Sequence, residues 1–181
     1  MVVTAKKNTY KDYEQLPEGA PYQLIDGELV MTPSPTYGHQ RVIRSLVADL
    51  LTYLAQNPVG EIIFAPMDVY LSETEVYQPD IVFISNKRRH IIQERIQGVP
   101  DLIIEVISPA NAYYDLVHKK NAYEATGVQE YWIVDPQEKT IEVFENRDGE
   151  FKTLTRKKLN GTVSSRLLGG FSVSLERLFS N

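Results

Sequence analysis

The sequence predicts an α/β fold in which a mixed central β-sheet is flanked by helices and extended by β-hairpins. Three observations lead to this prediction: an amphipathic helical pattern at residues 39–56, a strand at residues 101–108 with two apolar faces, and a second helical pattern at residues 115–126 followed by further strands. A strand that is apolar on both faces lies inside a sheet that is covered on both sides. Helices on both faces of one sheet therefore account for the order of the elements.

The first element is a hairpin over residues 22–31. The runs YQLI and ELVM flank Asp26-Gly27, and a turn of this type needs positive φ at both central positions, which aspartate and glycine tolerate. We expect the first helix from about His39 to Gln56, since Asn57-Pro58 would end it. Its apolar residues recur at helical spacing: Val42, Ile43, Leu46, Val47, Leu50, Leu51 and Leu54.

Strand-like segments follow this helix. Residues 61–64 and 67–71 are expected to pair with each other or to form one bulged strand, and residues 81–85 form another strand. A basic, partly helical segment at residues 86–97 leads into the doubly apolar strand. The faces of that strand carry Ile103 and Ile107 on one side, and Leu102, Ile104 and Val106 on the other.

The last third of the chain is expected to begin with a helix over residues 115–126. Gly127 stands where a helix commonly stops, because glycine adopts the left-handed conformation at low cost. Strands are expected next, and the chain ends in a short strand and a helical turn. The expected strands cover residues 129–135, 140–145 and 151–155.

Composition limits both the organisation and the chemistry. A length of 181 residues, with 43% hydrophobic and 24% charged residues, fits one globular domain over residues 1–181, with residues 1–12 as a loose N-terminal tail. The chain has no cysteine, which excludes a disulfide framework, a thiol nucleophile and cysteine-held metals. It has neither a long apolar run nor the apolar core of a secretory signal. We therefore expect a cytoplasmic protein with no membrane partner.

The net charge of −5 argues at first against a nucleic-acid partner, because phosphate binding favours a basic surface. The charge is unevenly distributed, since residues 61–80 carry five carboxylates and neither lysine nor arginine. Basic residues gather at residues 87–95 and 147–158. This pattern fits a metal-dependent enzyme that acts on a polyanion. The alternative is solvated strand edges and loops, the commoner origin of such charges.

Glu105 is the most informative residue, because it lies in the middle of the most apolar strand. A buried carboxylate is costly unless a cation or hydrogen bonds compensate it. It is therefore either half of a structural ion pair or a metal ligand or acid–base group. A partner carboxylate is expected on an adjacent strand, which favours Asp80 at the head of residues 81–85. Asp101 shares a strand with Glu105 at roughly 13 Å, so it is expected to hydrogen-bond at the strand start.

A lysine is expected beside these carboxylates. The helix at residues 115–126 runs back along the sheet, so that either Lys119 or Lys120 comes level with Glu105. Leu116 and Tyr123 define the inward-facing apolar stripe of this helix, and the two lysines flank it about equally, so the helical pattern does not choose between them. Two carboxylates and a lysine form a set that can hold Mg²⁺ or Mn²⁺ and hydrolyse a phosphodiester bond. An ion pair that only supports the fold would use the same residue types.

The chain resembles the Uma-type family of restriction-endonuclease-like proteins, formerly a domain of unknown function. The resemblance covers roughly residues 10–179 and rests on the motifs YQLIDGELVM, QPDIVFIS, VPDLIIEVISP and GVQEYWIVDP, and on the spacing of Asp115, Lys119 and Tyr123. It implies a restriction-endonuclease-like core of the PD-(D/E)XK superfamily. One departure is Ile107, which stands where the superfamily pattern places its lysine.

The resemblance assigns a role to each candidate residue. Asp80 and Glu105 match the two acids that hold the metal, and Lys119 matches a lysine displaced to the next helix. Glu28 and His39 match positions typical of the family, and they are weaker catalytic candidates. The alternative for Glu28 is a hairpin residue near solvent, and for His39 it is a helix-capping group.

Two functions remain open from the sequence. The first is a Mg²⁺-dependent (or Mn²⁺-dependent) endonuclease that acts on double-stranded DNA, and a homodimer is plausible because duplex cleavage needs two cuts. The second is a catalytically inactive module with the same fold that binds DNA or a protein partner. A histidine metal site, a phosphate-binding glycine loop and a serine-hydrolase elbow are not indicated by the motifs present.

Overall fold

The computed structural model describes residues 7–32, 34–108 and 114–180. Its helices are α1 (Tyr10–Tyr13), α2 (Tyr37–Gln56), α3 (Lys120–Thr126) and α4 (Leu175–Phe179), with a 3-10 helix η1 (Asn86–Ile91) and a π-helix η2 (Tyr114–Lys119). Its strands are β1 (Tyr22–Ile25), β2 (Glu28–Met31), β3 (Gly60–Phe64), β4 (Val69–Ser72), β5 (Glu75–Tyr77), β6 (Ile81–Ser85), β7 (Ile96–Gln97), β8 (Leu102–Val106), β9 (Glu130–Asp135), β10 (Thr140–Arg147), β11 (Glu150–Lys158), β12 (Thr162–Ser164) and β13 (Ser172–Ser174).

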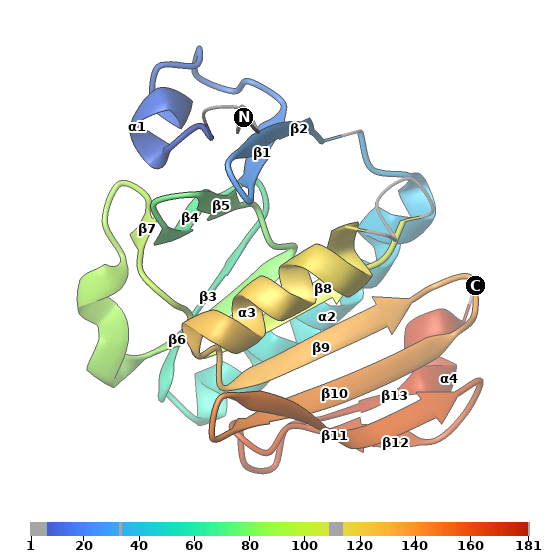
Figure 1. Cartoon of the computed structure of the whole chain (residues 1–181). Coiled ribbons are helices and arrows are strands. Elements are labelled where there is room, and N and C mark those ends of the chain that lie inside the picture. The colour runs from blue at the N-terminus through green and yellow to red at the C-terminus, as the bar shows by residue number, and fades with distance from the viewer. Residues whose placement is uncertain (1–6, 33, 109–113, 181) are drawn as a thin grey trace.

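The central sheet has six strands in the order β11-β10-β9-β8-β6-β3. Its β8–β9 pair is parallel and its other pairs are antiparallel, so the predicted mixed sheet is confirmed. All five residues of β8 are buried. This strand occupies the interior position that its two apolar faces predicted (Figure 1).

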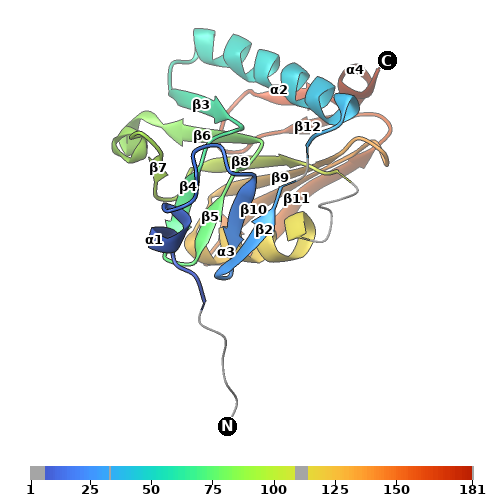
Figure 2. The same cartoon turned by 90° about the horizontal axis from the view of Figure 1, so that it is seen from above.

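Each face of the central sheet packs into its own apolar cluster. On one face, Leu102 and Ile104 of β8 pack with residues of α2, α4, β12 and β13. On the other face, Ile103 packs with Tyr123 of α3 and with residues of the second sheet. Figure 2 shows α2 and α3 on opposite sides of the central strands. The face that Ile103 shares with Glu105 is therefore the face covered by α3.

A second sheet, in the order β2-β1-β5-β4-β7, contains the predicted hairpin. The turn has positive φ at both Asp26 (48°) and Gly27 (74°), as a two-residue turn requires. Residues of this sheet and of the central sheet share one apolar cluster. Within the predicted tail, the amide of Asn8 donates to the Gly27 carbonyl at 2.9 Å and that of Tyr10 to the Glu73 carbonyl at 2.7 Å.

The expectation that residues 61–64 pair with residues 67–71 is wrong. β3 pairs with β6 in the central sheet, whereas β4 pairs with β5 and β7 in the second sheet. The chain changes sheets at Pro66, which has no amide proton for a ladder, and Asp68 then bonds to Arg95 outside the central sheet. An alternating pattern predicts that a strand forms, but it does not identify the strand with which that strand pairs.

Both predicted helices form, with changes at their starts. α2 begins two residues before the expected start, because Thr36 caps it by accepting a hydrogen bond from the His39 amide at 3.3 Å. The second helix begins as the π-helix η2 and continues as α3. It ends at Gly127, whose φ of 89° is left-handed as predicted. No helix in the described part of the chain is long and apolar enough to cross a bilayer.

Candidate active site

Glu105 projects from β8 into the layer between the central sheet and α3. Its side chain is only 2% exposed, so its charge needs compensation. The Lys119 ammonium donates to Oε1 of Glu105 at 3.0 Å, and the Tyr123 hydroxyl donates to the same oxygen at 2.7 Å. The buried carboxylate is thus held by a cation and a neutral donor from one helical segment.

The structure separates the two lysines that the helical pattern left equivalent. Lys119 is 3% exposed and reaches Glu105, whereas the Lys120 ammonium lies 3.8 Å from the centroid of the Phe144 ring. Lys119 is the last residue of the π-helix, a local change of winding that is frequent at functional sites. The lysine facing the carboxylate is therefore the one selected by the family resemblance.

Tyr123 was predicted only as part of an inward-facing apolar stripe, and its bond to Glu105 was not foreseen. The residue is fully buried, and burial together with the Glu105 charge raises the pKa of its hydroxyl well above the ordinary value. It therefore stays protonated and acts as a hydrogen-bond donor. The available signal was its position four residues after Lys119, which places both side chains on one helix face.

Asp80 immediately precedes β6, and the pairing of β6 with β8 places it opposite Glu105. Ile81 pairs with Ile104 in antiparallel strands, so the next position along each strand joins Asp80 and Glu105. Asp80 Oδ2 accepts a hydrogen bond from the Val106 amide at 2.7 Å. Both carboxylates line one pocket of about 260 Å³.

Asp101 behaves as the strand-start residue that its spacing predicted. Its Oδ2 accepts from the Ser85 amide at 2.7 Å, and its Oδ1 accepts from the Gln129 side chain at 2.6 Å. It is not among the residues that line the pocket. The choice of Asp80 over Asp101 therefore agrees with the geometry.

His39 reaches the site from the first turn of α2. Its Nε2 lies 3.3 Å from Asp80 Oδ2, while Thr36 provides the helix cap that was the alternative role for this histidine. Burial alone would lower the pKa of the imidazole, but the hydrogen bond to Asp80 and the Asp80 charge outweigh it and raise the pKa above its usual value. Its Nδ1 is buried and has no hydrogen-bond partner within the described part of the chain.

Glu28 is not brought to this pocket. It is exposed and directly follows the hairpin turn, whereas Thr32, four residues further on, does line the pocket. Four extended residues span roughly 13 Å, which separates Glu28 from the part of the hairpin that lines the pocket. The hairpin instead contributes Gln23, whose Nε2 donates to Thr32 at 3.1 Å.

The donor set at this pocket fits a hard divalent cation held in part by the protein. Among residues 7–32, 34–108 and 114–180, no group of three or more acidic or histidine side chains forms a complete metal cage. Mg²⁺ usually binds proteins through one or two carboxylates and keeps several waters or substrate oxygens. Two carboxylates lining one open pocket match that mode.

Two carboxylates of the acidic segment at residues 61–80 are paired with arginines, and a third accepts a backbone hydrogen bond. Glu61 pairs with Arg89 at 3.1 Å, Asp68 pairs with Arg95, and Glu75 accepts from the Asp26 amide at 3.0 Å. Among its carboxylates, Asp80 is the one that lines the pocket with Glu105. The other four acidic residues of the segment therefore lie outside the candidate site.

Comparisons with known proteins agree with this geometry. A family model described as "Putative restriction endonuclease" (Uma2) matches residues 10–176. One similar solved structure is described as a "putative nuclease belonging to DUF820" from Anabaena variabilis, with a TM-score of 0.78, 20% sequence identity, and coverage of 94% of this chain and 97% of that chain. No curated protein matches the chain. At this identity the structural likeness supports the fold.

Proposed function

Since the chain belongs to the Uma2 family, described as putative restriction endonucleases, we propose that it is an endonuclease that hydrolyses phosphodiester bonds of double-stranded DNA with Mg²⁺ or Mn²⁺. The observation that carries the proposal is the meeting of Asp80, Glu105 and Lys119 at one pocket. A module that only binds DNA or protein would have no need for two carboxylates and a nearly buried lysine at one opening.

Asp80 and Glu105 are the residues that would hold the divalent ion. When bound, such an ion supplies Lewis-acid polarisation of a phosphoryl oxygen and lowers the pKa of a coordinated water. The Val106 amide orients the Asp80 carboxylate through its bond to Oδ2. Lys119 and Tyr123 fix the Glu105 carboxylate through Oε1.

Lys119 also places a positive charge on the pocket wall. A fixed ammonium near the scissile phosphate stabilises the negative charge that builds up on the phosphoryl oxygens. Ile107, at the usual lysine position of the superfamily, packs against the apolar cluster under α3. Lys119 in the helical segment that covers β8 therefore supplies the positive charge that the superfamily pattern places at the position of Ile107.

His39 is a second donor at the same opening. Its raised pKa favours the protonated imidazolium, which donates through Nε2 to Asp80. The buried Nδ1 is then available as a donor to an oxygen of a bound phosphate, since both nitrogens of an imidazolium carry protons. We assign His39 to orienting Asp80 and contacting the phosphate.

The test is relaxation of supercoiled plasmid in Mg²⁺ or Mn²⁺ by the wild type and by two neighbouring lysine variants. Lys119→Met should abolish nicking, whereas Lys120→Met should retain it, because Lys120 packs on Phe144. Glu105→Gln and Asp80→Asn should abolish it as well. Far-UV circular dichroism of each variant checks that the loss is not unfolding.

Failure of the well-folded wild type to nick any plasmid in either ion, together with absence of divalent-ion binding, would establish the alternative of an inactive nuclease-fold module. We also propose that the active form is a homodimer, since two symmetric pockets would serve the two strands of a duplex. Light scattering coupled to size-exclusion chromatography measures this directly. A strictly monomeric protein that still makes double-strand cuts would contradict the dimer proposal.

A further inference from the structure

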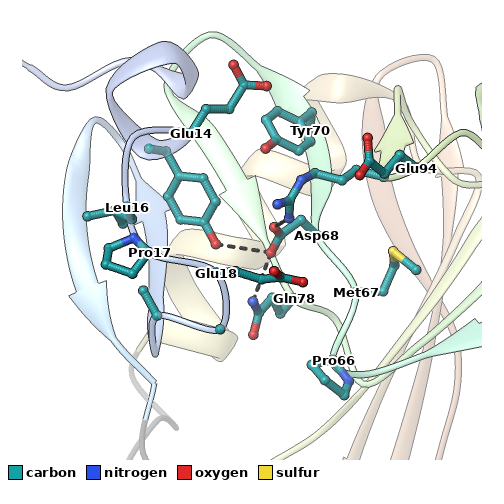
Figure 3. A pocket seen from close by; sticks show the side chains of 14 residues that line it. Glu14, Leu16, Pro17, Glu18, Pro66, Met67, Asp68, Tyr70, Gln78 and Glu94 are labelled. Atoms are coloured by element: carbon teal, nitrogen blue, oxygen red, sulfur yellow. Dashed lines mark hydrogen bonds and ion pairs between the residues drawn. The ribbon is translucent and has the colours of Figure 1, made fainter.

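A second pocket, of about 350 Å³, lies between α1, the loop that follows it and the start of β4 (Figure 3). It shares Pro66 and Gln78 with the candidate active site, but none of Asp80, Glu105, Lys119 or His39 lines it. The nuclease proposal leaves its polar side chains without a role.

The buried centre of this pocket is Asp68, which is 6% exposed. Its carboxylate is satisfied within the protein: it bonds to Arg95, accepts from the Tyr13 hydroxyl at 3.0 Å and accepts from the Gln78 side chain at 2.8 Å. The Asp68–Arg95 pair therefore contributes little net charge to the pocket. The charge of the cavity is set by the groups around this pair.

Tyr70 supplies the observation that points to a ligand. The residue is only 6% exposed, yet its hydroxyl has no hydrogen-bond partner among the residues that the structure describes. Figure 3 shows that hydroxyl directed into the pocket. A buried tyrosine hydroxyl usually has a hydrogen-bond partner, so the unsatisfied hydroxyl of Tyr70 indicates that a ligand can supply one.

The rim of the pocket is strongly acidic. Beside the Asp68–Arg95 pair it carries Glu14, Glu18 and Glu94, all exposed. Burial opposes the effect, but the charge of Asp68 and, more weakly, that of Glu94 raise the pKa of Arg95, so Glu94 is partly compensated. Glu14 and Glu18 form no salt bridge with another described residue. Figure 3 shows Glu18 reaching toward Gln78, with Glu14 and Glu94 on either side of Tyr70. Because Arg95 is already paired with Asp68, the three rim carboxylates leave the cavity with an excess of negative charge, which repels anions and attracts cations.

We propose that this pocket binds an alkylammonium cation of the polyamine class. The ammonium donates hydrogen bonds to the Tyr70 oxygen and to the rim carboxylates, and the aromatic rings of Tyr13 and Tyr70 in the pocket wall favour a cation over an anion. The methylene chain packs on Leu16, Pro17 and Met67, which also line the pocket. An elongated ligand with several ammonium groups matches carboxylates that are spread around a rim.

The test is isothermal titration at fixed ionic strength with spermidine, n-butylammonium and the neutral n-butanol. The wild type should bind spermidine saturably, n-butylammonium more weakly, and n-butanol not at all. Tyr70→Phe and Glu18→Gln should each weaken spermidine binding about tenfold, since the first removes a hydrogen-bond acceptor for the ammonium and the second removes the negative charge of another acceptor. Tyr10→Phe is the matched control, because Tyr10 contacts the Tyr70 ring but does not line the pocket.

Three results would each overturn the proposal: no saturable spermidine binding, equal binding of n-butanol, or unchanged affinity in both pocket variants. Glu18 is exposed, so Glu18→Gln keeps the test valid even where the tyrosine variant folds poorly. Binding at this pocket does not depend on the nuclease proposal. Plasmid relaxation and spermidine titration therefore succeed or fail separately.

Discussion

The Lys119 ammonium lies 3.0 Å from Glu105 Oε1, and both side chains are almost completely buried. The pair joins a helical segment on one face of the central sheet to the strand in its interior. A buried ion pair contributes little net stability, because the loss of hydration offsets the attraction, but removal of one partner leaves an uncompensated charge. Substitutions of Glu105 and Lys119 are therefore expected to have separate effects on stability and on activity.

Lys119→Met alone should lower the free energy of unfolding by about 3–5 kcal/mol. The double variant Glu105→Gln/Lys119→Met should recover part of that loss, because it leaves no buried charge unpaired. Urea denaturation of the single and double variants measures the coupling. Strictly additive losses would show that the two side chains do not interact in solution.

Tyr123→Phe should reduce nicking and lower the free energy of unfolding by about 1.5–3 kcal/mol, since it removes a hydrogen bond to a charged group. Tyr77→Phe is the matched control. Tyr77 is also buried and contacts the Tyr123 ring, but its hydroxyl donates to Glu75 instead of Glu105. Equal loss of nicking in both variants, at similar stability, would contradict the role given to Tyr123.

The His39 pKa predicts a pH-dependent contribution to stability. A group whose pKa is raised on folding stabilises the protein fully below its unfolded pKa, and this contribution disappears as pH rises through the folded pKa. In the presence of a chelator, the wild type should therefore lose stability relative to His39→Gln as pH rises from below about 6.5. Chemical denaturation across this range measures it, and a constant difference would contradict the raised pKa.

Tyr70→Phe should leave the free energy of unfolding unchanged or raise it by up to about 1 kcal/mol, because it removes a buried hydroxyl that lacks a partner. The comparison is Tyr13→Phe, which removes a hydroxyl bonded to Asp68 and should destabilise the fold. Thermal unfolding of the two variants distinguishes them. A marked loss of stability in Tyr70→Phe would mean that its hydroxyl is already satisfied within the protein.

Much of the fold could be predicted from the sequence, because the patterns that indicate its strands, turns and helix ends are local. The doubly apolar strand, predicted at residues 101–108, forms at residues 102–106, and the Asp26-Gly27 turn and the helix end at Gly127 appear in the structure as predicted. The pairing of residues 61–64 with residues 67–71 failed because strand partners are chosen by long-range packing, which alternation does not encode.

The site was readable only in part. The predicted burial of Glu105 indicated that its charge needs a compensating partner. Strand geometry favoured Asp80 over Asp101 as the second carboxylate of the site. Helical spacing could not choose between Lys119 and Lys120, because both flank the inward stripe and the π-helix that sets their final directions has no signal in the periodicity. The contact between His39 and Asp80 depends on how α2 packs against the central sheet, and no local sequence pattern predicts that packing.

The central claim, that Asp80 and Glu105 together hold a divalent cation, is tested most directly by titrating Mn²⁺ into the protein and following the free ion by electron paramagnetic resonance. The wild type and Glu28→Gln should bind Mn²⁺ with the same affinity, because Glu28 lies outside the pocket, whereas Asp80→Asn and Glu105→Gln should lose this binding. Undiminished Mn²⁺ binding in the Asp80 and Glu105 variants, or loss of binding in Glu28→Gln alone, would contradict the account.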